Sequence, residues 1–114
     1  MLYKNVANIT GDLIDEWANR REDDLNLIET WKMDKKNRSK NFEFVENTEQ
    51  LDNIDHNNID FLLGIFANGH LPMDYKRDTS PKGQPSLEQM TTAAIKVLRK
   101  NKNGYLLVVS YFFK

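Results

Sequence analysis

The chain has 114 residues and no cysteine; 39% of its residues are hydrophobic and 29% are charged. This length suits one domain with a modest core, and the composition is that of a globular chain rather than a disordered one. A net charge of -1 provides no general attraction to nucleic acid or anionic lipid. Because no apolar run approaches the roughly 20 residues of a membrane span, we also expect no membrane-spanning helix. The lack of cysteine excludes disulfides, a thiol nucleophile and thiolate metal sites.

The N-terminal third predicts one helix followed by a charged segment. Helical spacing of apolar side chains near the start predicts a first helix, marked by Leu13, Ile14, Trp17 and Ala18. Leu25, Ile28 and Trp31 either continue this helix or form a second short one. Residues 32–41, "KMDKKNRSKN", are charged and poor in apolar residues, so we expect a loop there. Residues 22–41 as a whole are therefore predicted to be a charged insertion or loop.

The middle of the chain predicts two short strands. Residues 42–45 alternate apolar and polar side chains, which is typical of a strand with one buried face. Residues 48–58 have room for one or two helical turns at most. Residues 59–66, "IDFLLGIF", form a continuous apolar run of strand length. The following residues, 67–85, are interrupted by Gly and Pro and predict a long loop.

The C-terminal part contains the helix that the sequence specifies best. Ser86 is a suitable N-cap, and Gln89 three residues later completes a capping box. The apolar stripe of this helix, which we expect to reach about Asn101, consists of Leu87, Met90, Ala94, Val97 and Leu98. Residues 105–109, "YLLVV", follow a tight turn at Asn103-Gly104 and predict a buried strand.

The order of these elements predicts an α/β fold. A strand, a long loop, a helix and a second strand over residues 59–110 form a βαβ unit, which favours a right-handed crossover and parallel strands. Strands that are apolar on both faces are covered by helices on both sides. We therefore expect residues 1–114 to form a single partial α/β domain.

The residues alone predict no active site. The two histidines, His56 and His70, have no HxxxH spacing, so loop histidines are favoured over metal ligands. Asp12, Asp15 and Glu16 match a helix N-terminus better than a catalytic carboxylate cluster. The basic run "DKKNRSK" has no interleaved aromatic residue, so a solvated loop is favoured over a phosphate or nucleic-acid contact. Glycine-rich phosphate loops, a nucleophile elbow and HExxH are absent from the sequence.

Five stretches of the sequence resemble, in order, a central part of the animal-type alkaline phosphatases. They are "GDLIDEWANRR", "NFEFVENTEQL", "IDFLLGIF", "MDYKRD" and "PSLEQMTTAAIKVLRKNKNGYLLVV". The match covers residues 11–109, with a longer charged segment around residues 22–40. It is specific because several unrelated local patterns occur in one order.

The resemblance implies part of a three-layer α/β sandwich from a phosphomonoesterase. In that family a serine is transiently phosphorylated between two zinc ions and a magnesium ion, and the substrates are phosphate monoesters. Animal members are homodimeric glycoproteins held at the cell surface by a lipid anchor. The first 17 residues show no apolar secretory signal, so the compartment of this chain stays open.

The resemblance also shows where the family's metal ligands are replaced. The strand that matches residues 105–109 leads in the family into "EGGRIDH", whose Glu binds magnesium; Ser110 occupies that position here. A calcium-type site of vertebrate members uses the carbonyl of a Phe, matched by Phe66, and two carboxylates. Ala67 and Gln84 stand at those carboxylate positions. Neutral groups are weak ligands for hard dications, so we expect no metal, cofactor-binding or catalytic residue in this chain.

Two classes of function stay open at this point. The chain is either part of an alkaline phosphatase that is inactive by itself, or a non-catalytic relict or small interaction module with the same partial fold. Ser110 as a substitute nucleophile is disfavoured, because no histidine is near it in sequence. The family's sheet continues beyond this stretch, so we expect the isolated chain to self-associate through apolar side chains, among them Leu62, Leu63, Ile65, Leu106 and Val108.

Overall fold

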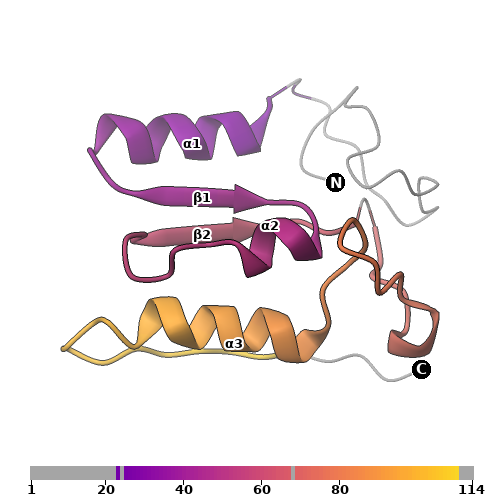
Figure 1. Ribbon diagram of the computed structural model, residues 1–114. Helices are drawn as coiled ribbons and strands as arrows, with labels where there is room; N and C mark the ends of the chain where they lie inside the picture. The colour runs from indigo at the N-terminus through magenta and orange to yellow at the C-terminus, as the bar shows by residue number, and fades with distance from the viewer. Residues whose placement is uncertain (1–22, 24, 68, 111–114) are drawn as a thin grey trace.

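The computed structural model describes residue 23 and residues 25–67 and 69–110 (Figure 1). The first helix expected around residues 13–18 lies outside these residues. The elements in chain order are α1 (Leu27–Asn37), β1 (Phe42–Val45), α2 (Thr48–Asp52), β2 (Phe61–Gly64), a 3-10 turn η1 (Asp74–Lys76) and α3 (Leu87–Leu98). The two strands, the short helix after the first strand and the long helix after the loop are confirmed.

The strands β1 and β2 pair in parallel, with Phe42 opposite Phe61 and Val45 opposite Gly64. Side chains alternate along each strand, so this pair presents two different faces. One face carries the rings of Phe42 and Phe61 and is covered by α1, whose Trp31 meets Phe42 edge-on at 5.3 Å between ring centroids. The expected fold class, a partial α/β layer, is confirmed.

The opposite face of the sheet carries the main core. Val45 of β1 and Leu51 of α2 are buried together with Phe66 and with Ala93 of α3. Leu62 of β2 lies on the same face of the sheet as Val45 and packs against this cluster. Helices therefore contact both faces of the strand pair, in the order α1, sheet, then α2 and α3.

The prediction of a loop over residues 32–41 is wrong as far as Asn37, because α1 continues to that residue. Asn26 caps the helix, its side chain accepting a hydrogen bond from the Glu29 N–H at 3.1 Å. The face of α1 toward the sheet has helical spacing, but two of its four members are charged: Ile28, Trp31, Lys32 and Lys35. Lysine stems and charges over aromatic rings replace the aliphatic stripe that hydropathy patterning detects.

Helix α3 follows its sequence signals closely. The Gln89 N–H donates to Ser86 Oγ at 3.1 Å, and the Ser86 N–H donates to Gln89 Oε1 at 2.9 Å, so the capping box is confirmed. The helix ends at Leu98, slightly before the expected end. Its buried residues are Ala93 and Val97, so the predicted stripe is displaced by one residue at the alanine pair. Leu87, which was predicted to belong to the stripe, is 40% exposed.

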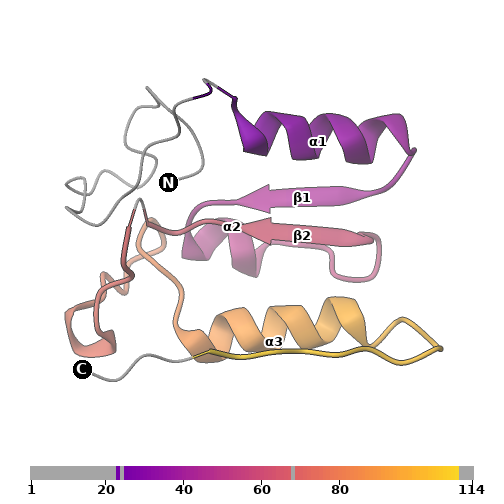
Figure 2. The same cartoon turned by 180° about the vertical axis from the view of Figure 1, so that it is seen from behind.

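Residues 105–110 depart from the prediction of a buried strand. They are extended but belong to no sheet, since β1 and β2 are the paired strands of the described residues. After a turn at Gly104, whose φ is 89°, the segment runs back along α3 (Figure 1, Figure 2). Leu106 is 85% exposed and Val108 is 78% exposed. The βαβ unit expected at residues 59–110 therefore lacks its second paired strand, and β1, α2 and β2 form the parallel unit instead.

Candidate functional site

The loop between β2 and α3 contains three of the four positions that the family resemblance singles out. Phe66 follows β2 and is only 7% exposed, since its ring belongs to the core. Ala67 is half-buried beside it. Gln84, just before α3, is 8% exposed. Ser110 is exposed at the far end of the extended segment.

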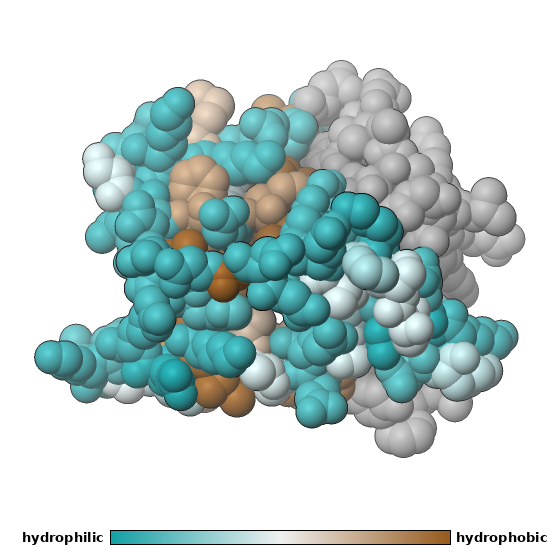
Figure 3. Space-filling model, in the orientation of Figure 1, coloured by the Kyte–Doolittle hydropathy of each residue, from teal (hydrophilic) through white to brown (hydrophobic). Residues whose placement is uncertain are grey.

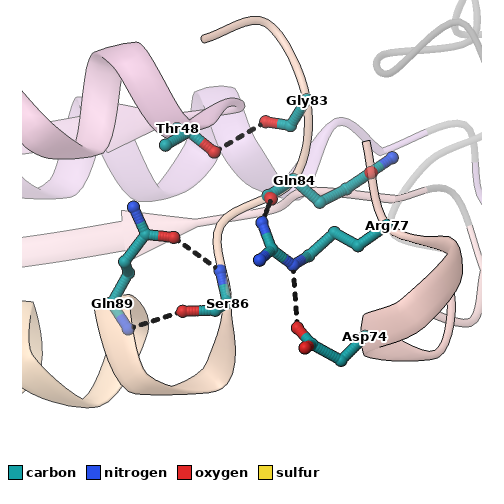
Figure 4. Close-up of polar contacts among 7 residues, drawn as sticks. All are labelled: Thr48, Asp74, Arg77, Gly83, Gln84, Ser86 and Gln89. Carbon is teal, nitrogen blue, oxygen red and sulfur yellow. Dashed lines mark hydrogen bonds and ion pairs between the residues drawn. The ribbon is translucent and has the colours of Figure 1, made fainter. Parts of the chain in front are cut away.

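Arg77 joins the two ends of the second half of this loop (Figure 4). Its Nε donates to Asp74 Oδ1 at 3.0 Å, and its Nη1 donates to the backbone carbonyl of Gln84 at 2.9 Å. The Arg77 side chain is 16% exposed, so the guanidinium is largely removed from water. A hydrogen bond from a charged and partly buried donor is stronger than one between neutral groups. Arg77 thus connects η1 to the start of α3.

The same loop is bonded to the N-terminus of α2. The Thr48 N–H and Oγ1 both donate to the carbonyl of Gly83, at 2.9 and 3.0 Å, and the Glu49 N–H donates to the carbonyl of Pro81 at 2.8 Å. The first N–H groups of a helix have no partner inside the helix, so these carbonyls satisfy them. An ion pair between Lys82 and Glu49 adds an exposed contact.

Gly83 is required by the packing of this loop. A Cβ added there would lie 2.0 Å from the backbone oxygen of Asp78 and 2.6 Å from its carbonyl carbon. Backbone atoms have little freedom to move away, so a larger residue would displace the loop. Asp78 itself forms a turn with Ser80, whose N–H donates to the Asp78 carboxylate at 2.9 Å. Hydrogen bonds from the backbone and then the side chain of Ser80 favour the charged carboxylate and lower the pKa of Asp78 from its usual 3.8.

A groove of about 380 Å³ lies between α2 and α3. Its lining mixes apolar, acidic and basic side chains: Leu51, Asp52, His56, Ser86, Glu88, Gln89, Thr92, Ala93 and Lys96. His56 is thus at the groove, whereas His70 is exposed in the loop after β2. Within the described residues, no group of three or more His, Cys, Asp or Glu side chains is arranged to hold a metal ion. No helix of that part of the chain is long and apolar enough to cross a membrane.

Sequence patterns alone did not reveal the network around Arg77 and Gly83. The bond between Thr48 and Gly83 joins residues 35 positions apart, and short-range periodicity contains no information at that separation. The one available signal was the glycine between two prolines in "PKGQP", residues 81–85, which marks a constrained turn.

The sequence of this chain is similar to sequences of known alkaline phosphatases. The alkaline phosphatase family model matches residues 4–110. The human tissue-nonspecific isozyme of alkaline phosphatase is 36% identical over 109 residues, which is 96% of this chain and 20% of the human protein. The alkaline phosphatase of Gadus morhua is 34% identical over 96% of the chain and 22% of its own length. A membrane-bound alkaline phosphatase of Bombyx mori is 35% identical over 84% of the chain and 18% of its own length.

The chain thus spans about a fifth of the length of these curated relatives. The five sequence stretches that resemble the family fall within the matched residues. Since the family model covers nearly the whole chain, this chain belongs to the alkaline phosphatase family.

Proposed function

We propose that this chain supplies one part of a phosphomonoesterase domain and does not catalyse phosphate ester hydrolysis by itself. The family membership supports the reaction class, hydrolysis of phosphate monoesters through a phosphoserine in a complete domain. The coverage of about 20% of the relatives supports the view that the rest of the machinery comes from other segments of such a domain.

The chemistry of the reaction also supports the view that other segments supply the catalytic groups. Phosphoryl transfer through a covalent intermediate needs a positioned nucleophile, stabilisation of the charge on the transferring group and an activated water. In the family, zinc and magnesium supply much of that stabilisation when bound. Ser110 occupies the position of the family's magnesium-binding Glu. Its side chain is neutral and exposed, so it does not fit a hard dication. We therefore assign no catalytic step to a metal held by this chain.

The extended segment 105–110 gives the main structural support for the proposal that this chain is one part of a larger domain. It is apolar, it has the shape of a strand, and its outward side chains Leu106 and Val108 are exposed. No backbone hydrogen bond joins it to the described residues. A strand in this state gains stability when neighbouring strands pair with it, as in a larger sheet. In the isolated chain the same segment would promote self-association.

A phosphatase assay tests the catalytic half of the proposal. The purified chain, supplied with zinc and magnesium at alkaline pH, should release no phosphate from p-nitrophenyl phosphate, whereas a complete homologue should be active in the same assay. The preparation must be free of host phosphatase. Metal-dependent turnover that disappears in Ser110→Ala would overturn the proposal, because it would identify Ser110 as a nucleophile.

A further inference from the structure

We propose that the loop of residues 74–86 is held in place by the Arg77 guanidinium and by backbone bonds to α2, without a bound divalent cation. The resemblance implies a calcium-type site at the corresponding loop of vertebrate family members, whereas in this chain the contacts of Arg77 and of the loop backbone maintain the shape of the loop.

The residues at the calcium-type positions do not fit such an ion. Calcium takes six to eight oxygen ligands and favours carboxylates. Phe66 has its ring in the core, and its carbonyl would be one ligand at most. Ala67 has only a methyl group, and Gln84 presents a neutral amide. The site therefore lacks both anionic side chains that would offset the cost of removing the ion from water.

The guanidinium of Arg77 already connects the two ends of the loop. Its two hydrogen bonds tie Asp74 at one end of the loop to Gln84 at the other, and the side chain is largely buried. The planar guanidinium can direct separate N–H groups to the carboxylate and to the carbonyl at once. A lysine ammonium on a flexible stem does not reproduce this geometry.

The loop then docks on α2 through groups that need no metal. The carbonyls of Gly83 and Pro81 accept from the N–H groups of Thr48 and Glu49. Thr48 is buried, so its amide hydrogen exchanges with solvent only when the loop opens. Exchange at Thr48 and Glu49 is therefore a direct measure of loop docking.

The experiment is amide hydrogen exchange on the full 114-residue chain, with millimolar calcium chloride or with EGTA. We expect the exchange rates of Thr48 and Glu49 to be the same in both conditions. Arg77→Gln should raise both rates by about tenfold or more, because two charge-assisted bonds are lost. Lys76→Gln is the matched control: it removes the same charge from the neighbouring exposed position and should leave the rates near those of the wild type.

Two further variants keep the proposal testable if the Arg77→Gln protein does not fold. Arg77→Lys keeps the charge and should raise the rates by less than Arg77→Gln does. Asp74→Asn keeps the bond between Arg77 and Gln84, so it should also raise the exchange rates by less than Arg77→Gln does. The proposal is overturned if calcium slows exchange in the wild-type chain in a saturable way. It is equally overturned if the Arg77 variants exchange like Lys76→Gln.

Discussion

The ammonium of Lys35 lies 4.6 Å from the centre of the Phe61 ring, which joins α1 to β2. The same nitrogen is 5.7 Å from the ring of Trp31 and 2.7 Å from the carboxylate of Asp34. With its side chain only 11% exposed, Lys35 covers the aromatic face of the sheet much as an aliphatic residue would. A charged residue is thus part of the packing of the layer that α1 forms.

Replacing Lys35 by alanine should therefore destabilise the chain. The loss of the buried stem and of the cation–π contacts predicts a decrease of about 1–2 kcal/mol in the free energy of unfolding. Lys36→Ala is the control, since Lys36 is exposed, and its effect should stay within about 0.5 kcal/mol. Urea unfolding followed by tryptophan fluorescence measures both. Equal effects of the two substitutions would show that the ring contacts of Lys35 add no stability beyond that of an exposed lysine.

Gly83→Ala should disrupt the docking of the loop on α2. The new methyl group would meet the backbone of Asp78, and overpacking of this kind costs about 1–3 kcal/mol. Gly104→Ala provides a contrast, because no atom lies within 4 Å of a Cβ there and the only penalty comes from its positive φ. Thermal unfolding compares the two, and limited proteolysis should cut the loop faster in Gly83→Ala alone. Unchanged proteolysis in Gly83→Ala would contradict the loop geometry.

Acid should destabilise the folded chain through Asp78 and Asp34. Hydrogen bonds from Ser80 lower the pKa of Asp78, and the hydrogen bond from Lys35 is the main cause that lowers the pKa of Asp34. A carboxyl group with a lower pKa in the folded state adds stability above its unfolded pKa and loses it as the pH falls through the folded value. The urea midpoint should therefore decrease from about pH 5 to about pH 3.

The variants Asp78→Asn and Asp34→Asn separate this effect from general acid unfolding. Each removes one titrating carboxylate, so each should show a smaller decrease of the urea midpoint over the same pH range than the wild type. Both effects should be small, since the two carboxylates are exposed to solvent. An identical pH dependence in wild type and both variants would rule out these groups as the cause.

The double substitution Leu106→Lys with Val108→Lys should reduce self-association. These side chains point outward from the extended segment, and like charges on an unpaired strand oppose edge-to-edge pairing. Met33→Lys, a change of an exposed apolar residue on α1, should leave association unchanged. Sedimentation velocity at several concentrations measures the difference. A monomeric wild-type chain with a sharp cooperative melt well above room temperature would contradict the prediction and favour an independent small module.

Local sequence patterns were sufficient for several elements. The capping box at Ser86 and Gln89 needs only residues three positions apart, and it predicted where α3 begins. The alternation in residues 42–45 and the apolar run at residues 59–66 predicted β1 and β2 for the same reason. The order of the five family stretches determined the family, since the family model matches the same part of the chain.

Tertiary structure decided the remaining features, because each depends on a partner distant in sequence. Residues 32–37 are helical where lysines meet the rings of Phe44 and Phe61, and a hydropathy pattern counts those lysines as surface residues. The loop contact between Thr48 and Gly83 joins residues 35 positions apart, so no local pattern predicts it. Residues 105–109 have strand-like composition, but a strand needs a hydrogen-bonded neighbour, and composition does not specify whether one is present. Side-chain pattern therefore determined the local conformation, and contacts across the fold determined which surfaces became buried.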